Sequence, residues 1–380
     1  MTYNVDRGSS TLRKYTLAIL IGILSIGVAC SPEEPVVAAT PVQIVRSGPP
    51  VGIPLKVGYG VQGGWYEVYF TDPSNPFSSQ RTGGVDGPLG GAIASARQSV
   101  DIAACDLTLI SVRDALIAAS RRGVEVRAVM ESDHLEGADP QLLVEAGIQV
   151  VGDQRQGLMH DSFIVIDRSE VWTGSMDFTE SAVYEDHNTL FRVRSSEVAE
   201  NYTHDFEEMF INGNFGPEKG TATTPHLIIR IDGTRLDNYF SPAGGAASRI
   251  IELLKNADES IHFLAYSFTN DDFGKVLSDK ADQGLSVSGV MDQEQAHSSL
   301  GTEYDPLRLA GIDVRLAGGP GHLGHQVLII DGKVVILGSY GFSRAADNEN
   351  DENVLIIFSP QIAQMFLQEF QRVYAQARYP

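Results

Sequence analysis

Short apolar runs alternate with helical periodicity along most of the chain. In one stretch, apolar runs over 100–104 and 124–130 enclose residues 107–121, where apolar side chains recur every three to four positions. Residues 261–291 show the same order again. Because this alternation is typical of β-α-β units, it predicts an α/β fold in which mixed sheets are flanked by helices.

The chain also contains one long internal repeat. The tripeptide Ala-Gly-Ile at 146–148 returns at 310–312, and the pair Gly-Ser at 174–175 returns at 338–339, in both cases 164 positions later. A unit of about 160 residues is too long for a solenoid repeat and has the size of a domain. We therefore expect two tandem α/β repeats related by a pseudo-two-fold axis.

The first 55 residues have a different character. Basic residues are followed by an apolar run and then by Cys30, which is the layout of a secretory signal. It resembles a bacterial lipoprotein signal, in which the cysteine becomes the lipid-modified first residue; an ordinary secretory signal and an uncleaved anchor are the alternatives. The division expected is a signal peptide over 1–29, a proline-rich tether over 30–55, and repeats over 56–219 and 220–380. The sequence thus predicts an exported protein, either anchored to the cell envelope or secreted.

Composition narrows the range of partners. Among 380 residues, 28 are basic and 49 acidic, which gives a formal net charge of −21. A protein that binds nucleic acid through a broad basic surface has the opposite balance. The hydrophobic share of 43 % and the charged share of 20 % are those of an ordinary globular chain.

Each repeat contains one segment in which polar residues interrupt an apolar strand. In the first, His160 and Ser162 precede Asp167, and Gly-Ser follows at 174–175. In the second, residues 321–331 read Gly-His-Leu-Gly-His-Gln-Val-Leu-Ile-Ile-Asp, before Gly-Ser at 338–339. Since residues two apart on a strand share a face, residues 160 and 162 are expected to point to one side.

These segments resemble the two halves of the phospholipase D superfamily, whose signature is His-x-Lys-x4-Asp followed by Gly-Ser-x-Asn. The resemblance covers residues 56–380. It implies hydrolysis of a phosphodiester, in which one histidine attacks phosphorus, a second protonates the leaving oxygen, and two lysines hold the phosphate oxygens. It implies no metal and no other cofactor.

The chain departs from this signature at several positions. Other residues stand at five motif positions: Ser162 and Gln326 for the lysines, Gly324 for the second histidine, and Asp177 and Gly341 for the asparagines. His325 is one residue out of register and is expected to face away from the site. His322 has the parity of Gly324 but lies about 6.6 Å further along the strand. His160 is the motif histidine that remains.

The candidate residues fall into two groups. The catalytic candidates are His160, with His322 or His325 as the acid, together with Asp167, Asp331 and Glu352. The candidates for contact with substrate are Ser162, Ser175, Asp177, Asn188, Gln326, Ser339 and Asn353. Asp167 and Asp331 end apolar strands before turns, and the resemblance gives them a largely architectural role.

Several acidic groups need a separate interpretation. Glu352 resembles the family acid that orients a catalytic histidine, but His187 stands at what we take to be its counterpart. We therefore expect His160 to lack its carboxylate and Glu352 to lack a histidine. A metal site that includes Asp161 is disfavoured, because Asp161 has the wrong strand parity to join His160. Residues 131–139 are expected to be solvated loop charges.

Two functions remain open. One is a phosphodiesterase that works through a phosphohistidine at His160, impaired by the loss of both lysines and the second histidine. The other is a non-catalytic phospholipase D-fold lipoprotein that serves binding or assembly. The predicted anchor and the charge of −21 favour a phospholipid over a nucleic acid as the phosphodiester partner.

Overall fold

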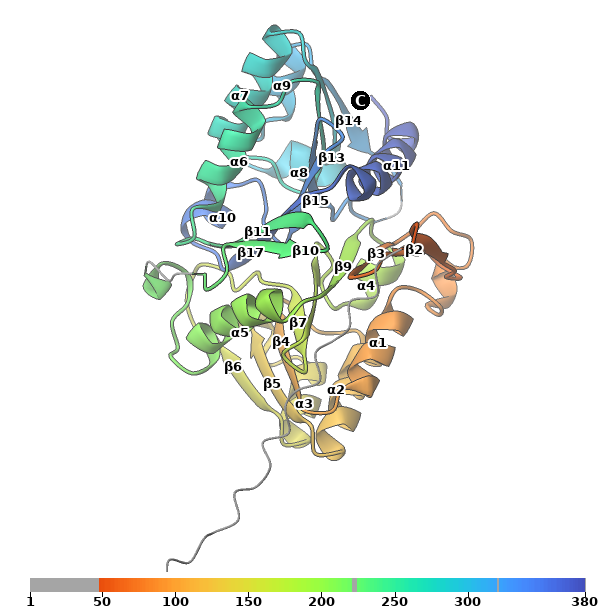
Figure 1. Ribbon diagram of the computed structural model, residues 1–380, viewed down its shortest axis with the longest axis vertical. Helices are drawn as coiled ribbons and strands as arrows, with labels where there is room; N and C mark the ends of the chain where they lie inside the picture. Colours follow the sequence, from red (N-terminus) through yellow and green to blue (C-terminus); the bar gives the residue numbers. More distant parts are fainter. Residues whose placement is uncertain (1–47, 221–223, 320, 380) are drawn as a thin grey trace, which may run out of the picture. The chain divides into compact units, whose positions relative to one another are not determined.

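Two mixed β-sheets, one from each repeat, form the frame of the structure (Figure 1). The computed structural model describes residues 48–220, 224–319 and 321–379, so the predicted signal peptide, Cys30 and most of the predicted tether lie outside the described residues. In hydrogen-bonded order, the first sheet consists of β1 (Val51–Ile53), β2 (Tyr59–Gln62), β3 (Tyr66–Phe70), β9 (Thr189–Arg194), β8 (Glu170–Gly174), β7 (Phe163–Ile166), β4 (Ser99–Ala104), β5 (Glu125–Met130) and β6 (Gln149–Gly152). The second consists of β10 (Ile228–Ile231), β11 (Thr234–Ser241), β17 (Glu352–Phe358), β16 (Val334–Gly338), β15 (Gln326–Ile330), β12 (Ser260–Ala265), β13 (Ser286–Asp292) and β14 (Asp313–Ala317).

Apart from the additional edge strand β1, the two sheets share one topology, which confirms the predicted pair of α/β repeats. Strands β4, β5 and β6 are parallel, as are β12, β13 and β14, and the remaining pairings are antiparallel. One boundary differs from expectation. Strand β1 lies in the range predicted as tether, and it pairs antiparallel with β2 at the edge of the sheet.

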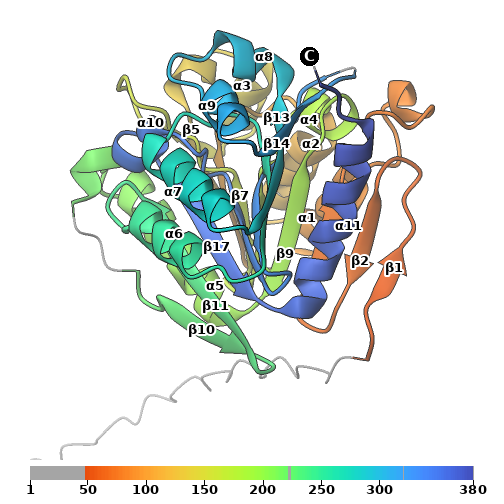
Figure 2. The ribbon, with the colours of Figure 1, turned by 90° about the horizontal axis from the view of Figure 1, so that it is seen from above.

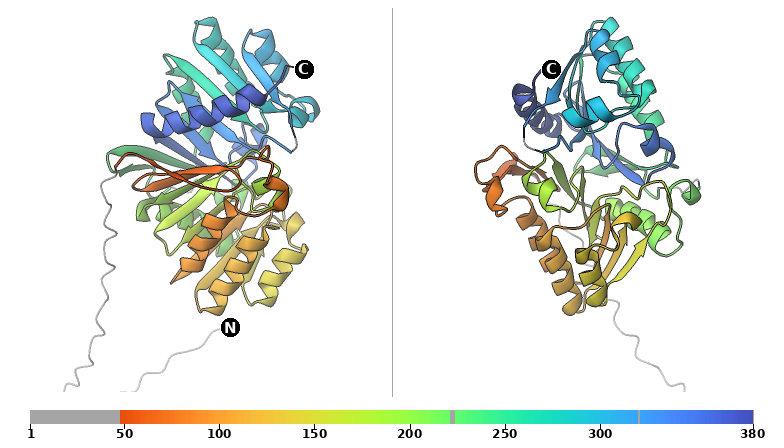
Figure 3. Two further views of the ribbon diagram at one scale, coloured as in Figure 1. Left: turned by 90° about the vertical axis from the view of Figure 1, so that its right-hand side faces the viewer. Right: turned by 180° about the vertical axis from the view of Figure 1, so that it is seen from behind.

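Helices cover both faces of each sheet. The helices are α1 (Asp86–Ser95), α2 (Ile110–Arg121), α3 (Ala138–Glu145), α4 (Glu180–Tyr184), α5 (Ser196–Phe210), α6 (Ala246–Lys255), α7 (Asp271–Asp282), α8 (Gln293–Ser298), α9 (Tyr304–Leu309), α10 (Arg344–Asn348) and α11 (Pro360–Gln376), with short 3-10 turns at Ser78–Gln80, Ser132–His134 and Gly216–Lys219. Helices α1 to α3 pack on the outer face of the first sheet and α6, α7 and α9 on that of the second (Figures 2 and 3). Helices α5 and α11 lie on the inner faces.

The repeats meet in a shared hydrophobic core. It joins buried residues of both sheets with those of α5 and α11, including Phe206 and Phe370, which stand 164 positions apart. Ser195 and Ser359, also 164 apart, cap the first turns of these two helices through their side chains. Strands buried on both faces need near-continuous apolar runs, which is the pattern that the sequence shows. Among the described residues, no helix is both long and apolar enough to cross a membrane.

Candidate active site

A pocket of about 450 Å³ lies where the two repeats meet, and we call it the central pocket. It is lined by residues that directly follow β4, β5 and β12, namely Cys105, Glu131 and Tyr266. The carboxyl ends of parallel strands are the common site of ligand binding in α/β sheets. Of the predicted site residues, its lining includes His160, Ser162, Ser175, Asp177, Asn188, His322, Gln326 and Ser339.

His160 is held by contacts from the other repeat. Met159 forms an isolated bridge with Asp351, and the His160 backbone N–H donates to the Asp351 carbonyl over 3.1 Å. This pairing brings His160 Nδ1 to 2.8 Å from Glu352 Oε2. The expectation that His160 lacks a carboxylate was therefore wrong. The acid of the second repeat orients the histidine of the first.

The equivalent place in the second repeat is filled differently. His187 forms an isolated bridge with Leu323, which is the counterpart of the bridge between Met159 and Asp351. Asn188, and not His187, therefore stands opposite Gly324. A Cβ at Gly324 would lie 2.2 Å from Asn188 Oδ1. The second histidine and its acid have thus been replaced together, by a glycine and by an amide that occupies the freed space.

The hydroxyl groups in the pocket differ in what they offer a ligand. Ser162 donates to Asp177 Oδ1 over 2.8 Å, and Ser175 donates to Asn188 Oδ1 over 2.9 Å, so both protons are engaged. Ser339 Oγ instead accepts from the Asn353 backbone N–H at 3.1 Å and from Asn353 Nδ2 at 3.2 Å. Its own proton remains available to an acceptor in the pocket.

The two remaining histidine candidates, His322 and His325, lie in different environments. The imidazole of His322 lines the pocket, edge-to-face with Tyr266, with its Nδ1 3.3 Å from Asp292 Oδ2. His325 is fully buried between Thr189 Oγ1 at 2.8 Å and Glu369 Oε1 at 2.9 Å, and it does not line the pocket. His322 is therefore the histidine of the second repeat that can reach a ligand beside His160.

Asp167 and Asp331 hold backbone at the far ends of strands β4 and β12. Asp167 Oδ1 accepts from the N–H groups of residues 97–99, and Asp331 Oδ1 from those of residues 258–260. Those residues begin the strands whose carboxyl ends form the pocket. Both aspartates therefore anchor the chain that enters β4 and β12, as the architectural role implied by the resemblance requires, and neither lines the central pocket.

Asn353 and Asp161 belong to a buried polar cluster behind the pocket. Asn353 Nδ2 donates to Asp161 Oδ1 over 2.9 Å. Asn353 was predicted to contact substrate, but it does not line the pocket. Lys219 Nζ lies 2.9 Å from Asp205 Oδ1 and 2.8 Å from Asp351 Oδ1. Burial and neighbouring carboxylates raise the pKa of Asp161 and of Asp205. One buried ammonium thus offsets several carboxylates directly behind His160.

We expect Lys219→Met to lower the free energy of unfolding by about 3–5 kcal/mol, since it leaves buried carboxylates without their cation. The measurement is urea denaturation followed by circular dichroism at pH 7. The control is Lys333→Met, which removes an exposed ion pair with Glu259 and should leave stability nearly unchanged. Equal effects of the two substitutions would contradict the role given to Lys219.

Acidic residues in the pocket were missed or misread from the sequence. Residues 131–139 were predicted to be solvated, but Glu131 and Asp133 line the pocket, and Glu131 Oε2 accepts from the Met159 N–H over 2.8 Å. Asp292 accepts from Leu323 in the same way. The signal was present as an acid at the carboxyl end of the second parallel strand of each repeat. The described residues contain no group of three or more His, Cys, Asp or Glu side chains arranged to hold a metal ion.

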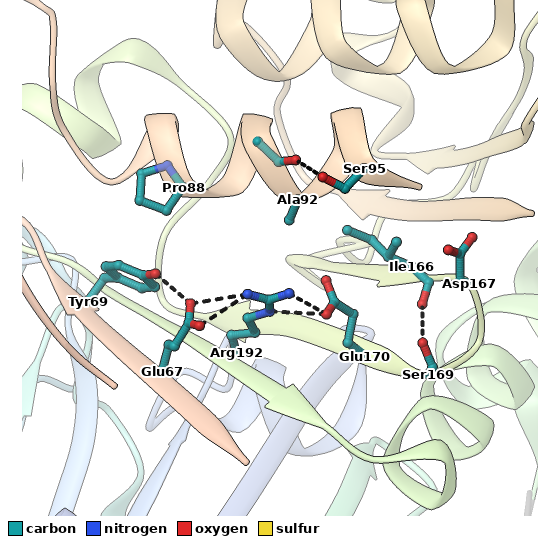
Figure 4. A pocket seen from close by; sticks show the side chains of 11 residues that line it. Glu67, Tyr69, Pro88, Ala92, Ser95, Ile166, Asp167, Ser169, Glu170 and Arg192 are labelled. Atoms are coloured by element: carbon teal, nitrogen blue, oxygen red, sulfur yellow. Dashed lines mark hydrogen bonds and ion pairs between the residues drawn. The ribbon is translucent and has the colours of Figure 1, made fainter. Parts of the chain in front are cut away.

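A second hollow, of about 370 Å³, lies between α1 and strands β3, β8 and β9 of the first sheet (Figure 4). Arg192 lies between Glu67 and Glu170 and bonds to both, and Tyr69 donates to Glu67 (Figure 4). In the second repeat, Arg249 of α6 reaches Asp237 instead. Glu67, Glu170 and Arg192 satisfy one another, and Asp167 binds backbone N–H groups, so this hollow has a structural role.

Two α/β repeats of one topology, with a histidine of the first repeat paired to a carboxylate of the second at their junction, define a class of duplicated α/β proteins. A family model described as "Cardiolipin synthase, PLD-like domain" matches residues 89–210 and 250–374, more than half of the chain. The chain belongs to the phospholipase D superfamily.

Several known proteins resemble parts of this chain. A mitochondrial cardiolipin hydrolase of Chlamydomonas reinhardtii is 31 % identical over 135 residues, which are 36 % of this chain and 60 % of that protein. A phospholipase D of Rickettsia typhi is 34 % identical over 150 residues, 40 % of this chain and 73 % of that protein. The crystal structure of phosphatidylserine synthase from Haemophilus influenzae has the same fold, with a TM-score of 0.60, 11 % identity, and coverage of 82 % of this chain and 87 % of that one.

Proposed function

We propose that this chain is a phospholipase D-type phosphodiesterase in which His160 attacks the phosphorus of a phospholipid diester. The observation that carries the proposal is the 2.8 Å contact between His160 Nδ1 and Glu352 Oε2. With Nδ1 donating to the carboxylate, the other ring nitrogen, Nε2, is the nucleophile.

The reaction has two steps. In the first, Nε2 of His160 forms a bond to phosphorus, the bond from phosphorus to the leaving alcohol breaks, and the alcohol oxygen takes a proton from His322. In the second, water gives a proton to His322 and its oxygen bonds to phosphorus, while the P–N bond breaks. His160 and His322 both line the central pocket, as this scheme requires.

Turnover is expected to be slow. Among the residues that the structure describes, no lysine or arginine lines the central pocket. Each missing charge-stabilising donor costs about 10²–10³ in rate. Ser339 and Gln326 are the uncharged groups that would contact the phosphate oxygens in their place.

Binding without turnover is the second candidate function. The observation that favours it is the paired replacement in the second repeat, where Asn188 fills the space opposite Gly324. A pocket of this kind still accommodates a phosphodiester but holds a single intact histidine–acid pair.

The experiment that separates the two compares wild-type protein with His160→Ala on bis-p-nitrophenyl phosphate, a fluorescent phosphatidylcholine and a single-stranded oligonucleotide. We expect wild-type turnover at least tenfold above the variant, on the phospholipid and not on the oligonucleotide. His297→Ala is the matched control, because His297 is exposed and lies outside the central pocket. Equal background rates for wild type and His160→Ala would leave the binding function.

We also propose that the chain is exported and carries a lipid on Cys30, which would hold the pocket near its substrate membrane. The support is the signal layout of residues 1–29 and the cysteine that follows. Metabolic labelling with a fatty-acid analogue should modify the wild-type chain and not Cys30→Ser. Equal labelling of both would contradict the proposal.

A further inference from the structure

A carboxylate at the end of the second parallel strand holds the motif segment in each repeat. Glu131 Oε2 accepts from the Met159 N–H over 2.8 Å, and Asp292 Oδ2 accepts from the Leu323 N–H over 3.0 Å. Met159 and Leu323 stand 164 positions apart, so the two carboxylates hold equivalent backbone. The repeats differ in the residue just before, which is a leucine in the first repeat and a histidine, His322, in the second.

His322 directs its ring at this carboxylate. Its Nδ1 lies 3.3 Å from Asp292 Oδ2, and its backbone N–H donates to Asp186 Oδ1 over 2.7 Å. The ring packs edge-to-face with Tyr266, with the ring centroids 5.7 Å apart. Asp292 Oδ1 accepts from the Gln295 N–H over 3.0 Å and so caps α8. The side chain of Asp292 is 4 % exposed and that of His322 is 43 % exposed, so a fixed carboxylate holds a ring that is open to the central pocket.

The motif positions of the second repeat no longer provide such a pair. Gly324 stands at the histidine position and Asn188 opposite it, and a Cβ at Gly324 would lie 2.2 Å from Asn188 Oδ1. A histidine at position 324 would therefore have to displace the amide. With Nδ1 of His322 directed at Asp292, the nitrogen left for a ligand is Nε2. Glu352 leaves Nε2 of His160 free in the same way, through its contact with Nδ1.

We infer that His322 and Asp292 form a second histidine–carboxylate pair, which takes over from the pair lost at positions 324 and 188. The inference rests on the proposed function, in which His322 is the acid, and it assigns Asp292 as the positioning residue. Its carboxylate fixes the orientation of the ring and stabilises the imidazolium.

The pair acts in both steps of the reaction. In the first, the proton on Nε2 of His322 passes to the leaving alcohol oxygen as the bond from that oxygen to phosphorus breaks. In the second, Nε2 takes a proton from the water whose oxygen bonds to phosphorus, while the bond from phosphorus to His160 breaks. Asp292 keeps its contact with Nδ1 throughout and exchanges no proton.

Two leaving groups test this assignment. The aliphatic alcohol of a phospholipid needs a proton as it departs, whereas p-nitrophenolate does not. Asp292→Asn should lower kcat on the fluorescent phosphatidylcholine at least tenfold, but should change the single-turnover release of p-nitrophenolate from bis-p-nitrophenyl phosphate by less than about threefold. A purely structural role for Asp292 would lower both rates together.

Further variants locate the effect in the pair. His322→Phe keeps a ring beside Tyr266 without the proton, and should lower kcat on the phospholipid by about 10²-fold or more. Adding Asp292→Asn to His322→Phe should cause little further loss, because Asp292 acts through the histidine. Glu294→Gln is the matched control, since Glu294 is exposed and outside the pocket lining, and it should leave both rates unchanged. An unchanged ratio of the two rates in Asp292→Asn, or a further tenfold loss in the double variant, overturns the inference.

Nitrogen NMR of the imidazole observes the pair without turnover, with the His322 signals assigned by their loss in His322→Phe. In the neutral ring of wild-type protein the proton should reside on Nδ1, because Asp292 accepts it, and this preference should be lost in Asp292→Asn. A wild-type ring with its proton on Nε2 overturns the inference, even in a protein that hydrolyses the substrate. A ring with its proton on Nδ1, in a protein without His160-dependent turnover, would support the pair and contradict the phosphodiesterase.

Discussion

Replacing Ser162 by lysine together with Asp177→Asn should raise His160-dependent hydrolysis by about 10²-fold or more. Ser162 occupies the lysine position of the motif, lines the central pocket, and gives its proton to Asp177. A lysine there places an ammonium beside the phosphate, and the asparagine removes the carboxylate that would otherwise pair with it. The measurement is kcat on bis-p-nitrophenyl phosphate.

The control for this gain is Ser162→Met with Asp177→Asn, which supplies similar length without the charge. It should leave kcat within a few-fold of wild type. The gain should vanish when His160→Ala is added, because the lysine stabilises charge on a reaction that the histidine begins. A stable lysine variant with unchanged kcat would show that charge at position 162 does not limit the rate.

The sequence predicted the fold well because its strands are buried on both faces. The apolar runs at 100–104 and 124–130 correspond to β4 and β5, and the helical pattern over 107–121 corresponds to α2. Strand β1 was missed, because a short edge strand with exposed Val51 carries no such run.

The site was predicted in part. Strand parity correctly separated His160 and Ser162, in the pocket, from His325, in the core. The partner of His160 was not predicted, because it depends on how two repeats face each other and not on either repeat alone. The offset of 164 residues, applied strictly, relates Glu352 to Asn188, so the sequence contains the equivalence of these two positions. It does not show that the acid of one repeat pairs with the histidine of the other.

The acidic lining shows a different limit. Carboxylates in loops usually face water, and the sequence of residues 131–139 contains nothing that distinguishes a solvated loop from one that bends over a pocket. The replacement of the motif lysines by uncharged residues was visible in the sequence. That Asp106, Asp133 and Tyr266 line the pocket became visible only in the folded structure.

Glu352→Gln should both lower the maximal rate and move the pH dependence of hydrolysis. Burial by itself would lower the pKa of His160, but Glu352, and then Asp177 and Asp161, raise it to about 10. Attack needs the neutral ring, and p-nitrophenolate leaves without a proton from His322, so wild-type kcat on bis-p-nitrophenyl phosphate should rise through neutral pH and level off near pH 10. Without the Glu352 carboxylate, the ring loses its proton at much lower pH, and the ascending limb should move down by more than one pH unit.

The plateau should fall by about 10²–10⁴, because the amide no longer fixes the tautomer and orientation of the ring. A purely structural role for Glu352 would lower kcat at every pH and leave the limb in place, so the profile from pH 5 to 10.5 discriminates. Glu349→Gln, an exposed neighbour outside the pocket, is the control and should keep the wild-type profile.

Stability gives an independent reading of the same pair. A histidine with a pKa raised from 6.5 to about 10 contributes stability that is fully present below pH 6.5 and is lost as the pH rises through about 10. The difference in free energy of unfolding between wild type and Glu352→Gln should therefore be largest near pH 6 and shrink toward pH 10. A difference that is constant with pH would mean that protonated His160 and the Glu352 carboxylate do not stabilise each other. The raised pKa of His160 would then not explain the alkaline position of the rate profile.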